Sequence, residues 1–322
     1  MSFVKNHQRF VIFVMILCIF ALLAPMWSYP VIAAPSGRAN ATPVLHGQQG
    51  RYVVADGASI GTVVGDVYAT DADGDALTYT LVGGDGFAVD PSSGALSVTV
   101  VPVRSAGVMR TVVVRASDGT ASATAAFSVF VTPAAPFAAS GVTRETYNSV
   151  NGGSVDEVRA SAKYKAGTPD ATTVVNQLLL TPQNVAENYG QRYRGYLIPS
   201  VSGAYRFWVA SDDSSEFRIG TSPDPSTLPT RPQASVSGCA GAYAWYDNAT
   251  TQVTDSMVLV KGQPYIVELF FKEAGGAEHV AVAWQGPGMS APVSGNAASV
   301  VPQANLKPID ALADDTPPTM PG

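Results

Sequence analysis

The stretch NYGQRYRGYLIPSVSGAYRFWVASDDSSEFRIG, residues 188–220, indicates the fold class. After a glycine turn, the run Ala204–Val209 alternates, so that every second side chain, aromatic or aliphatic, faces the same side of a strand. Asp212 and Asp213 follow after two intervening residues, where a strand meets a loop and functional groups are held by a rigid scaffold. The stretch therefore predicts a β-scaffold that carries a pair of carboxylates at a strand end.

The residues around this stretch continue the same pattern. Residues 264–272 are partly apolar on both faces, which predicts a central strand of a sandwich. One helical turn is expected within residues 170–180, although β-branched residues weaken it. The clearest expected strands are 203–210, 216–219, 255–260, 264–272 and 279–284.

The first half of the chain alternates in shorter runs. Phe127, Val129 and Val131 share one face, and Gly- and Asp-rich turns such as DADGD and SDGT separate the runs. This predicts an antiparallel sandwich of about seven strands. The expected fold class is all-β, with two consecutive β-sandwich domains after an N-terminal signal peptide. The expected boundaries are 1–33 signal peptide, 34–42 polar leader, 43–132 first sandwich, 133–136 linker, 137–308 second sandwich and 309–322 linker-like tail.

The N-terminus has the features of a secretion signal. Lys5 and Arg9 precede an uncharged apolar run over residues 10–24, and small residues predict cleavage after Ala33. A retained single-pass anchor is the alternative, against which the short run and the following Pro25 argue. We therefore expect a secreted or cell-surface protein, which contacts a membrane only if this segment is retained.

Charge and cysteine content limit the function further. Without residues 1–33 the chain has 17 basic and 25 acidic residues, a net charge of −8, and Cys239 is its one cysteine. A single cysteine cannot form an internal disulfide, so stability must come from core burial, aided by metal. An acidic surface disfavours nucleic acid and anionic lipid as partners and suits a metal cation.

The loop DADGD, residues 71–75, places three aspartates in alternation. It is not an EF-hand, because Ala76 and Val82 stand where that loop needs Gly and Glu. Residues 56–131 instead resemble a cadherin-type repeat, through GTVVGDVYATDADGDALTYTLVGG, FAVDPSSGAL and VVVRASDG. The resemblance implies weak Ca²⁺ binding, and the alternative is that these aspartates only cap their own turns. The implied ligands are Asp71, Asp73 and Asp118 at one pole and Asp56 at the other.

A second resemblance covers residues 141–306. ENYGQRYRGYLIPSVSGAYRFWVASDDSSEFRIGTSPDP, SMVLVKGQPYIVELFFKEAGG and HVAVAWQGPG follow in order and resemble the protective-antigen-type (PA-14 family) β-sandwich. In sugar-binding members of that family, the residues matching Asp212 and Asp213 hold Ca²⁺ through a cis peptide bond. Vicinal sugar hydroxyls complete the coordination there. The alternative is that the pair only ties down a loop.

A second loop is expected to wall the implied pocket, within residues 242–252 (AYAWYDNATTQ). Its oxygen-bearing side chains are candidate ion ligands, and its aromatic rings are surfaces on which a sugar ring can stack. The candidate ligands are Asp247, Asn248 and Gln252, and the candidate stacking residues are Tyr243, Trp245 and Tyr246.

Three classes of function remain open. The first is a non-catalytic, calcium-dependent carbohydrate-binding or adhesion module pair, with glycans or glycoconjugates and cell-surface molecules as partners. The second is a structural connector or accessory region of a larger surface protein or secreted glycosidase. The third, a hydrolase, is disfavoured because no nucleophile elbow, zinc motif or phosphate loop is present. We therefore expect a binding module and no enzyme.

Overall fold

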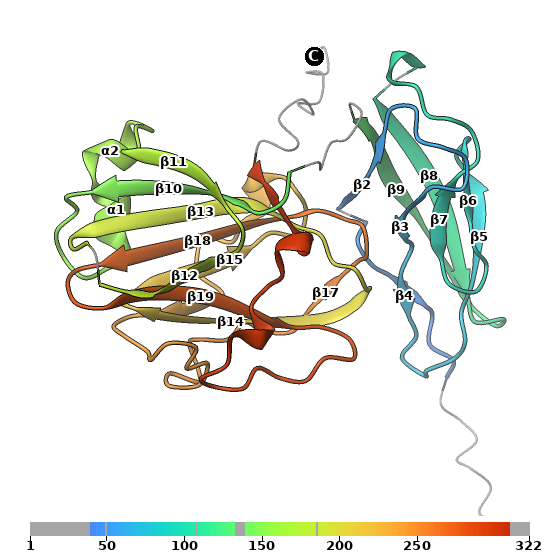
Figure 1. Cartoon of the computed structure of the whole chain (residues 1–322). Helices are drawn as coiled ribbons and strands as arrows, with labels where there is room; N and C mark the ends of the chain where they lie inside the picture. Colours follow the sequence, from blue (N-terminus) through green and yellow to red (C-terminus); the bar gives the residue numbers. More distant parts are fainter. Residues whose placement is uncertain (1–38, 49, 107, 133–138, 185, 310–322) are drawn as a thin grey trace, which may run out of the picture. The chain divides into compact units, whose positions relative to one another are not determined.

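The computed structural model describes residues 39–48, 50–106, 108–132, 139–184 and 186–309 (Figure 1). These residues are almost entirely strands and loops, which confirms the predicted all-β fold class. The expected signal peptide and linker, with most of the leader and tail, lie outside the described residues. Among the described residues, no helix has the length and apolarity needed to cross a membrane.

The first sandwich consists of a four-stranded sheet in the order β2-β9-β8-β5, a three-stranded sheet in the order β3-β7-β6, and the short pair β1-β4. Buried side chains of both larger sheets form one core. The strands are β1 Val44–Leu45, β2 Arg51–Ala55, β3 Val63–Asp66, β4 Ala69–Thr70, β5 Thr78–Gly83, β6 Phe87–Val89, β7 Ala95–Val98, β8 Met109–Ser117 and β9 Ser122–Thr132.

The alternation predicted for this half is confirmed. Phe127, Val129 and Val131 are all buried in the core. Two details differ from the expectation. The described residues of the first sandwich form nine strands instead of about seven, because several segments of only two to four residues also pair as strands. In addition, β2 pairs with β9 in parallel, since the first long strand lies beside the last one. Alternation predicts which face is buried and does not identify the neighbouring strand.

The second sandwich consists of a seven-stranded sheet, β11-β10-β13-β18-β15-β16 with β20 paired to β13, and a four-stranded sheet, β12-β19-β14-β17 (Figure 1). The large core cluster contains side chains from both sheets. The strands are β10 Val142–Asn148, β11 Ala171–Val175, β12 Leu179–Gln183, β13 Tyr189–Leu197, β14 Gly203–Asp212, β15 Ser215–Ile219, β16 Ala234–Val236, β17 Met257–Leu259, β18 Tyr265–Glu273, β19 Glu278–Gln285 and β20 Leu306–Pro308.

All five strands expected in this half are present, within one to two residues at each end, as β14, β15, β17, β18 and β19. β18 lies between β13 and β15, which confirms the prediction of a central strand. The helical turn expected within residues 170–180 is wrong, because β-branched residues there continue the sheet as β11. The helices are instead α1 (Val155–Ala160), which begins with a capping box formed by Ser154 and Glu157, and α2 (Ala162–Lys165).

Each sheet of the second sandwich also has a covered outer face. Val155 and Val158 of α1 pack with Phe270 of β18 in a second hydrophobic cluster. On the other sheet, Trp245 packs with Trp208 of β14 in a third cluster. Because both faces of these strands are buried, the groups at the strand ends are held by rigid surroundings.

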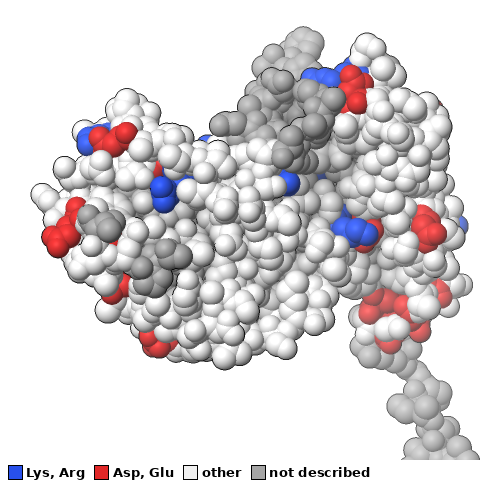
Figure 2. Space-filling model, viewed as in Figure 1, with Lys and Arg blue, Asp and Glu red and all other residues white. Residues whose placement is uncertain are grey.

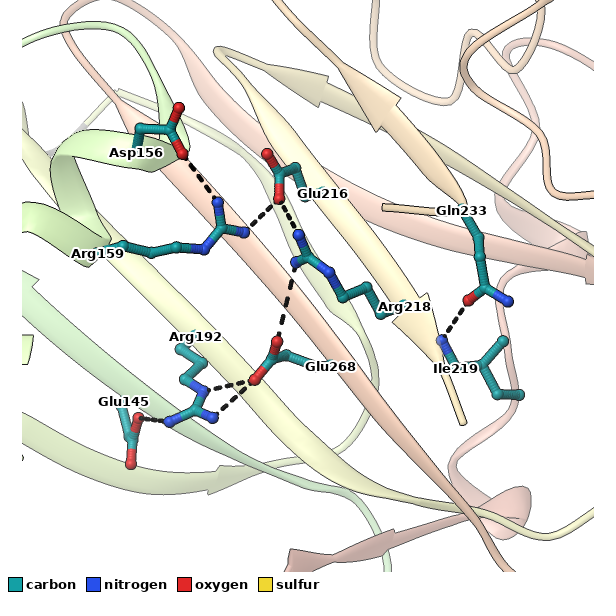
Figure 3. A network of polar contacts seen from close by, with 9 residues as sticks. All are labelled: Glu145, Asp156, Arg159, Arg192, Glu216, Arg218, Ile219, Gln233 and Glu268. Atoms are coloured by element: carbon teal, nitrogen blue, oxygen red, sulfur yellow. Dashed lines mark hydrogen bonds and ion pairs between the residues drawn. The ribbon is translucent and has the colours of Figure 1, made fainter. Parts of the chain in front are cut away.

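Charged side chains form a network on the outer face of the seven-stranded sheet (Figure 3). Glu216 of β15 accepts hydrogen bonds from Arg159 of α1 and from Nη2 of Arg218, the latter at 2.7 Å. Glu268 of β18 accepts hydrogen bonds from Nε of Arg192 at 2.9 Å and from Nη2 of Arg192 at 2.7 Å. The network therefore fastens α1 and β13 to the two strands beside the aspartate pair. Asp156 and Glu145 extend it at its two ends.

We predict that Gly190→Ala destabilises the second sandwich. A Cβ atom at position 190 would lie 2.3 Å from Cγ2 of Val158, so α1 must move away from β13. Overpacking of this kind costs about 1–3 kcal/mol, measurable by urea unfolding. Gly238→Ala is the matched control, because its added Cβ meets no described atom within 4 Å. Equal unfolding midpoints for the two variants would contradict the assigned packing.

We also predict that Glu216→Gln destabilises the protein near neutral pH by about 1–3 kcal/mol, because two guanidinium groups lose a carboxylate partner. Burial alone would raise the pKa of Glu216, but Arg159 and Arg218 outweigh it and lower the pKa below its ordinary value of 4.5. The carboxylate therefore contributes stability above that value and loses it as the pH falls through the lowered pKa. The free energy of unfolding of wild type and Glu216→Gln, measured across this pH range, should differ less as the pH falls. A difference that does not change with pH would contradict the prediction.

Candidate cation-binding site

The aspartate pair lies where β14 turns into β15. Asp212 is the last residue of β14 and pairs with His279 on β19. The peptide bond between Asp212 and Asp213 is cis, as the family resemblance implies. Oδ2 of Asp213 accepts a hydrogen bond of 2.7 Å from the backbone N–H of Ala274, in the turn between β18 and β19. Two turns, each of which connects the four-stranded and the seven-stranded sheet, therefore meet at the pair.

Buried serines fix the shape of this turn. Oγ of Ser211 donates to the carbonyl oxygen of Asp213 at 2.6 Å and accepts a hydrogen bond from Oγ of Ser215 at 2.7 Å. Oγ of Ser214 donates to the carbonyl oxygen of Gly153 at 2.9 Å, which ties the turn to the segment before α1. Ser211, Ser214 and Ser215 are all buried. The carboxylates are thus carried by a turn that hydrogen bonds hold on both sides.

The pair is electrostatically unfavourable without a counter-charge. Burial raises the pKa of Asp212, the charge of Asp213 raises it further, and His279 opposes the shift. Like charges that are close together and partly removed from water favour a bound proton or cation. The arrangement therefore suits a positive ligand.

Sequence reasoning missed a second group of charges beside the pair. Lys272 and Glu273 at the end of β18, and Glu278 at the start of β19, are fully buried. Burial, followed by the charges of Asp213, Glu278 and Asp212, raises the pKa of Glu273 to about 7, against the opposing charge of Lys272. Burial lowers the pKa of Lys272. The sequence feature that indicates this group is the position of Lys272 and Glu273 at the end of a strand that is partly apolar on both faces.

Two of the residues expected in the second loop have structural roles. Trp245 is fully buried, and its Nε1 donates to the carbonyl oxygen of Asn296 at 3.3 Å, so its ring does not present a surface to solvent. Gln252 is also fully buried. Its Nε2 donates to Val209 and Ala244 carbonyl oxygens, and its Oε1 accepts from the backbone N–H of Asn248. Gln252 therefore uses its amide group to hold the loop.

The other loop residues are more open. Tyr246 is 44% exposed, and Asp247 and Asn248 are exposed. Tyr243 is half-buried, with its ring centroid 6.0 Å from that of Trp245. The loop starts beside the aspartate pair, because the backbone N–H of Ala240 donates to the carbonyl oxygen of Ser211 at 2.8 Å. Tyr243, Tyr246, Asp247 and Asn248 therefore remain candidates for ligand contact.

The first sandwich contains a more compact acidic group. Asp71, Asp73 and Asp75 each place a carboxylate oxygen within 4.8 Å of the others. Oδ1 of Asp71 caps its own turn by accepting from the backbone N–H of Asp73 at 2.8 Å, whereas its buried Oδ2 has no hydrogen-bond partner among the described residues. The structure thus brings two predicted ligands together and adds Asp75, which the cadherin resemblance had not included.

The remaining predicted ligands of this sandwich lie in two places. Asp118 accepts from Nδ2 of Asn40 at 2.8 Å, and the next residue, Ala41, donates to Oδ2 of Asp73 at 2.6 Å. Asp118 therefore lies beside the acidic group. Asp56 lies elsewhere, where its Oδ1 accepts from the backbone N–H of Arg104 at 3.1 Å. The acidic group of Asp71, Asp73 and Asp75 therefore does not include Asp56.

Charged residues make up a small share of this chain. Asp, Glu, Lys and Arg make up 14% of the sequence. On the face shown in Figure 2, they form small separate groups of both signs with neutral surface between them. The electrostatics of a binding site on this face are therefore set by its immediate neighbours.

We predict different effects for two neighbouring residues of the second loop. Gln252→Ala should destabilise the second sandwich by about 1–3 kcal/mol, because buried backbone groups lose their partners. Asn248→Ala should change stability by less than about 0.5 kcal/mol, because its side chain is exposed. Thermal unfolding of both variants tests this, and a larger loss for Asn248→Ala would contradict the assigned roles.

Solved structures similar to this chain fall into two groups. The PA14 sugar-binding domain from an RTX adhesin is 17% identical, covers 53% of this chain and 99% of that chain, and has a TM-score of 0.39. The A domain of epithelial adhesin 6 from Candida glabrata, in complex with Galβ1-3GlcNAc, is 12% identical, covers 52% and 87%, and has a TM-score of 0.36. Human protocadherin-24 EC1-2 is 19% identical, covers 36% and 52%, and has a TM-score of 0.28.

Sequence comparison identifies the second sandwich. A curated relative from Mus musculus, N-acetyl-beta-glucosaminyl-glycoprotein 4-beta-N-acetylgalactosaminyltransferase 1, is 29% identical over 136 residues, which are 42% of this chain and 13% of that protein. The chain therefore spans only a small part of that relative's length. Residues 139–297 match the sequence profile of the PA14 domain. The predicted resemblance is confirmed, and the chain carries a PA14 domain over these residues.

Proposed function

We propose that this chain is a secreted or cell-surface module that binds carbohydrate through Ca²⁺ held at Asp212 and Asp213, without catalysing a reaction. The observation that carries the proposal is the meeting of three segments at one point. The β14–β15 turn supplies the two carboxylates, and Ala274 of the β18–β19 turn donates a hydrogen bond to one of them. The segment that leads into the second loop lies beside them, because the backbone N–H of Ala240 donates to the carbonyl oxygen of Ser211.

The donor set suits Ca²⁺. This ion prefers several hard oxygen ligands, and carboxylates and backbone carbonyls are its usual protein ligands. Asp212 and Asp213 are half-buried, so part of each carboxylate remains open to a ligand. Asp247 and Asn248 in the second loop are exposed and are the candidate additional ligands.

Carbohydrate binding follows from the same site. A bound Ca²⁺ accepts further oxygen ligands, and two vicinal hydroxyls of a sugar have a separation that can replace two waters. Tyr246 offers a partly exposed ring at 44% exposure, on which the apolar face of a sugar can pack. Glycans or glycoconjugates of cell surfaces are therefore the proposed partners.

We propose a second, weaker Ca²⁺ site in the first sandwich. Asp71, Asp73 and Asp75 are mutually close, and Asp71 has a buried carboxylate oxygen without a hydrogen-bond partner among the described residues. The group is partly exposed and already accepts backbone hydrogen bonds. An affinity in the millimolar range of extracellular modules is expected, so this ion would stiffen the domain more than bind a partner.

A structural connector is the second candidate function. The hydrogen bond from Ala274 to Asp213 favours it, because this contact ties one turn to the other without any ligand. Catalysis is not proposed. The mouse glycosyltransferase is matched over 13% of its length, which is too little to carry its activity over.

Calcium titration and glycan binding test the proposal. We predict that the wild-type chain binds Ca²⁺ by calorimetry and retains glycans on an array only with the ion present. Asp212→Asn with Asp213→Asn should abolish one Ca²⁺ binding phase and all glycan retention, because the ion loses its two carboxylates. Asp255→Asn is the matched control, since this exposed aspartate follows Thr254, whose backbone N–H donates to the carbonyl oxygen of Phe207 in the middle of β14.

The outcomes separate the candidate functions. Calcium-dependent glycan retention that the double variant loses and Asp255→Asn keeps would support the proposal. Calcium binding without glycan retention would favour the connector. Glycan retention that persists in chelator would contradict the site, and the absence of any Ca²⁺ binding at millimolar ion would contradict both ion sites.

A further inference from the structure

Glu273 is a buried carboxylate that receives no hydrogen bond from the described part of the chain. It is the last residue of β18 and is 0% exposed. Neither Oε1 nor Oε2 has a hydrogen-bond partner among the described residues. Buried polar groups in folded proteins are almost always hydrogen-bonded, and an unpaired buried charge is strongly destabilising. This side chain therefore requires an explanation.

The surroundings of Glu273 are mainly acidic. The residue after it, Ala274, donates its backbone N–H to Oδ2 of Asp213, so the end of β18 adjoins the aspartate pair. Asp213, Glu278 and Asp212 are the negative charges that act on Glu273. The nearby cation does not satisfy the carboxylate, because Nζ of Lys272 donates to the main-chain oxygen of Glu273. Negative charge thus exceeds positive charge in this region.

We propose that Glu273 is a third carboxylate of the cation site at Asp212 and Asp213. The site is then built by two turns, β14–β15 and β18–β19, and extends from the half-buried pair to a fully buried carboxylate. This inference rests on the proposed function, since it concerns the ion that the pair would hold. It goes further by assigning the role to a residue outside the aspartate pair and outside the second loop.

The arrangement of the carboxylates determines how Glu273 acts. Among the described residues, only Asp71, Asp73 and Asp75 form a trio with carboxylate oxygens within 4.8 Å of one another. Glu273 does not form such a trio with Asp212 and Asp213, so the proposal requires Glu273 to reach the ion by rotation of its side chain or through one bridging water. In both arrangements its negative charge strengthens cation binding, and the ion compensates the buried carboxylate.

Glu273→Gln tests this role, because it keeps the shape of the side chain and removes the charge. Calorimetric Ca²⁺ titration of the full chain would compare wild type, Glu273→Gln, and Asp212→Asn with Asp213→Asn. The binding phase that the aspartate double variant removes defines the site. Glu273→Gln should weaken that phase by about 10- to 100-fold. Glu145→Gln is the matched control, because this carboxylate pairs with Arg192 in the separate network of Figure 3.

The thermal midpoint of the metal-free proteins is the second readout. Metal-free Glu273→Gln should be as stable as wild type or more stable, because a buried unpaired charge is gone. Weaker Ca²⁺ binding together with unchanged or raised metal-free stability supports the proposal. An unchanged binding phase in Glu273→Gln would overturn this inference and leave the proposed function intact. A loss of metal-free stability would overturn it by giving the carboxylate a structural role. The absence of the phase in wild type would remove the proposed function, and this inference with it.

Discussion

The burial of β18 on both faces is the constraint on which the second sandwich depends. Val267, Leu269 and Phe271 face the core between the sheets. On the other face, Phe270 is covered by α1. A central strand in this position cannot move without disturbing two layers, so its last residues and the turn after it are fixed. That turn is the one that meets Asp213, and the position of the aspartate pair therefore follows from the packing of β18.

The same constraint produces the charge problem at the strand end. A strand buried on both faces carries its final residues, Lys272 and Glu273, into the interior with it. On the outer face of the same strand, buried charges are paired, because Glu268 accepts hydrogen bonds from Arg192 and lies near Arg218. At the end of β18, no described residue donates a hydrogen bond to the carboxylate of Glu273. Glu268 is paired with arginines and has a structural role. Glu273, on the same strand, receives no hydrogen bond from a described residue and is therefore a candidate ligand.

Much of this arrangement could be predicted from the sequence, since alternation is a direct consequence of strand geometry. It gave the five strands around the aspartate pair and the central position of β18. It could not place Trp245, because an aromatic residue in a loop can cover a sheet or face solvent, and the choice depends on Trp208 across the fold. It also missed α1, whose six residues are too few to show a helical period. Glu273 escaped notice because a charge at a strand end is usually solvated.

The two acidic groups of this chain differ in a way that proximity alone does not reveal. In the first sandwich, carboxylate oxygens lie within 4.8 Å of one another, but backbone N–H groups of Asp73 and Ala41 already compensate part of their charge, and water reaches the group. In the second sandwich, the carboxylates are less tightly clustered, yet Glu273 is fully buried and receives no hydrogen bond from any described residue. For a buried charge, the free-energy cost of desolvation is larger than the change in charge–charge repulsion caused by a few ångströms of extra separation. The energetic need for a cation is therefore greater at the end of β18 than in the loop where the aspartates are closest together.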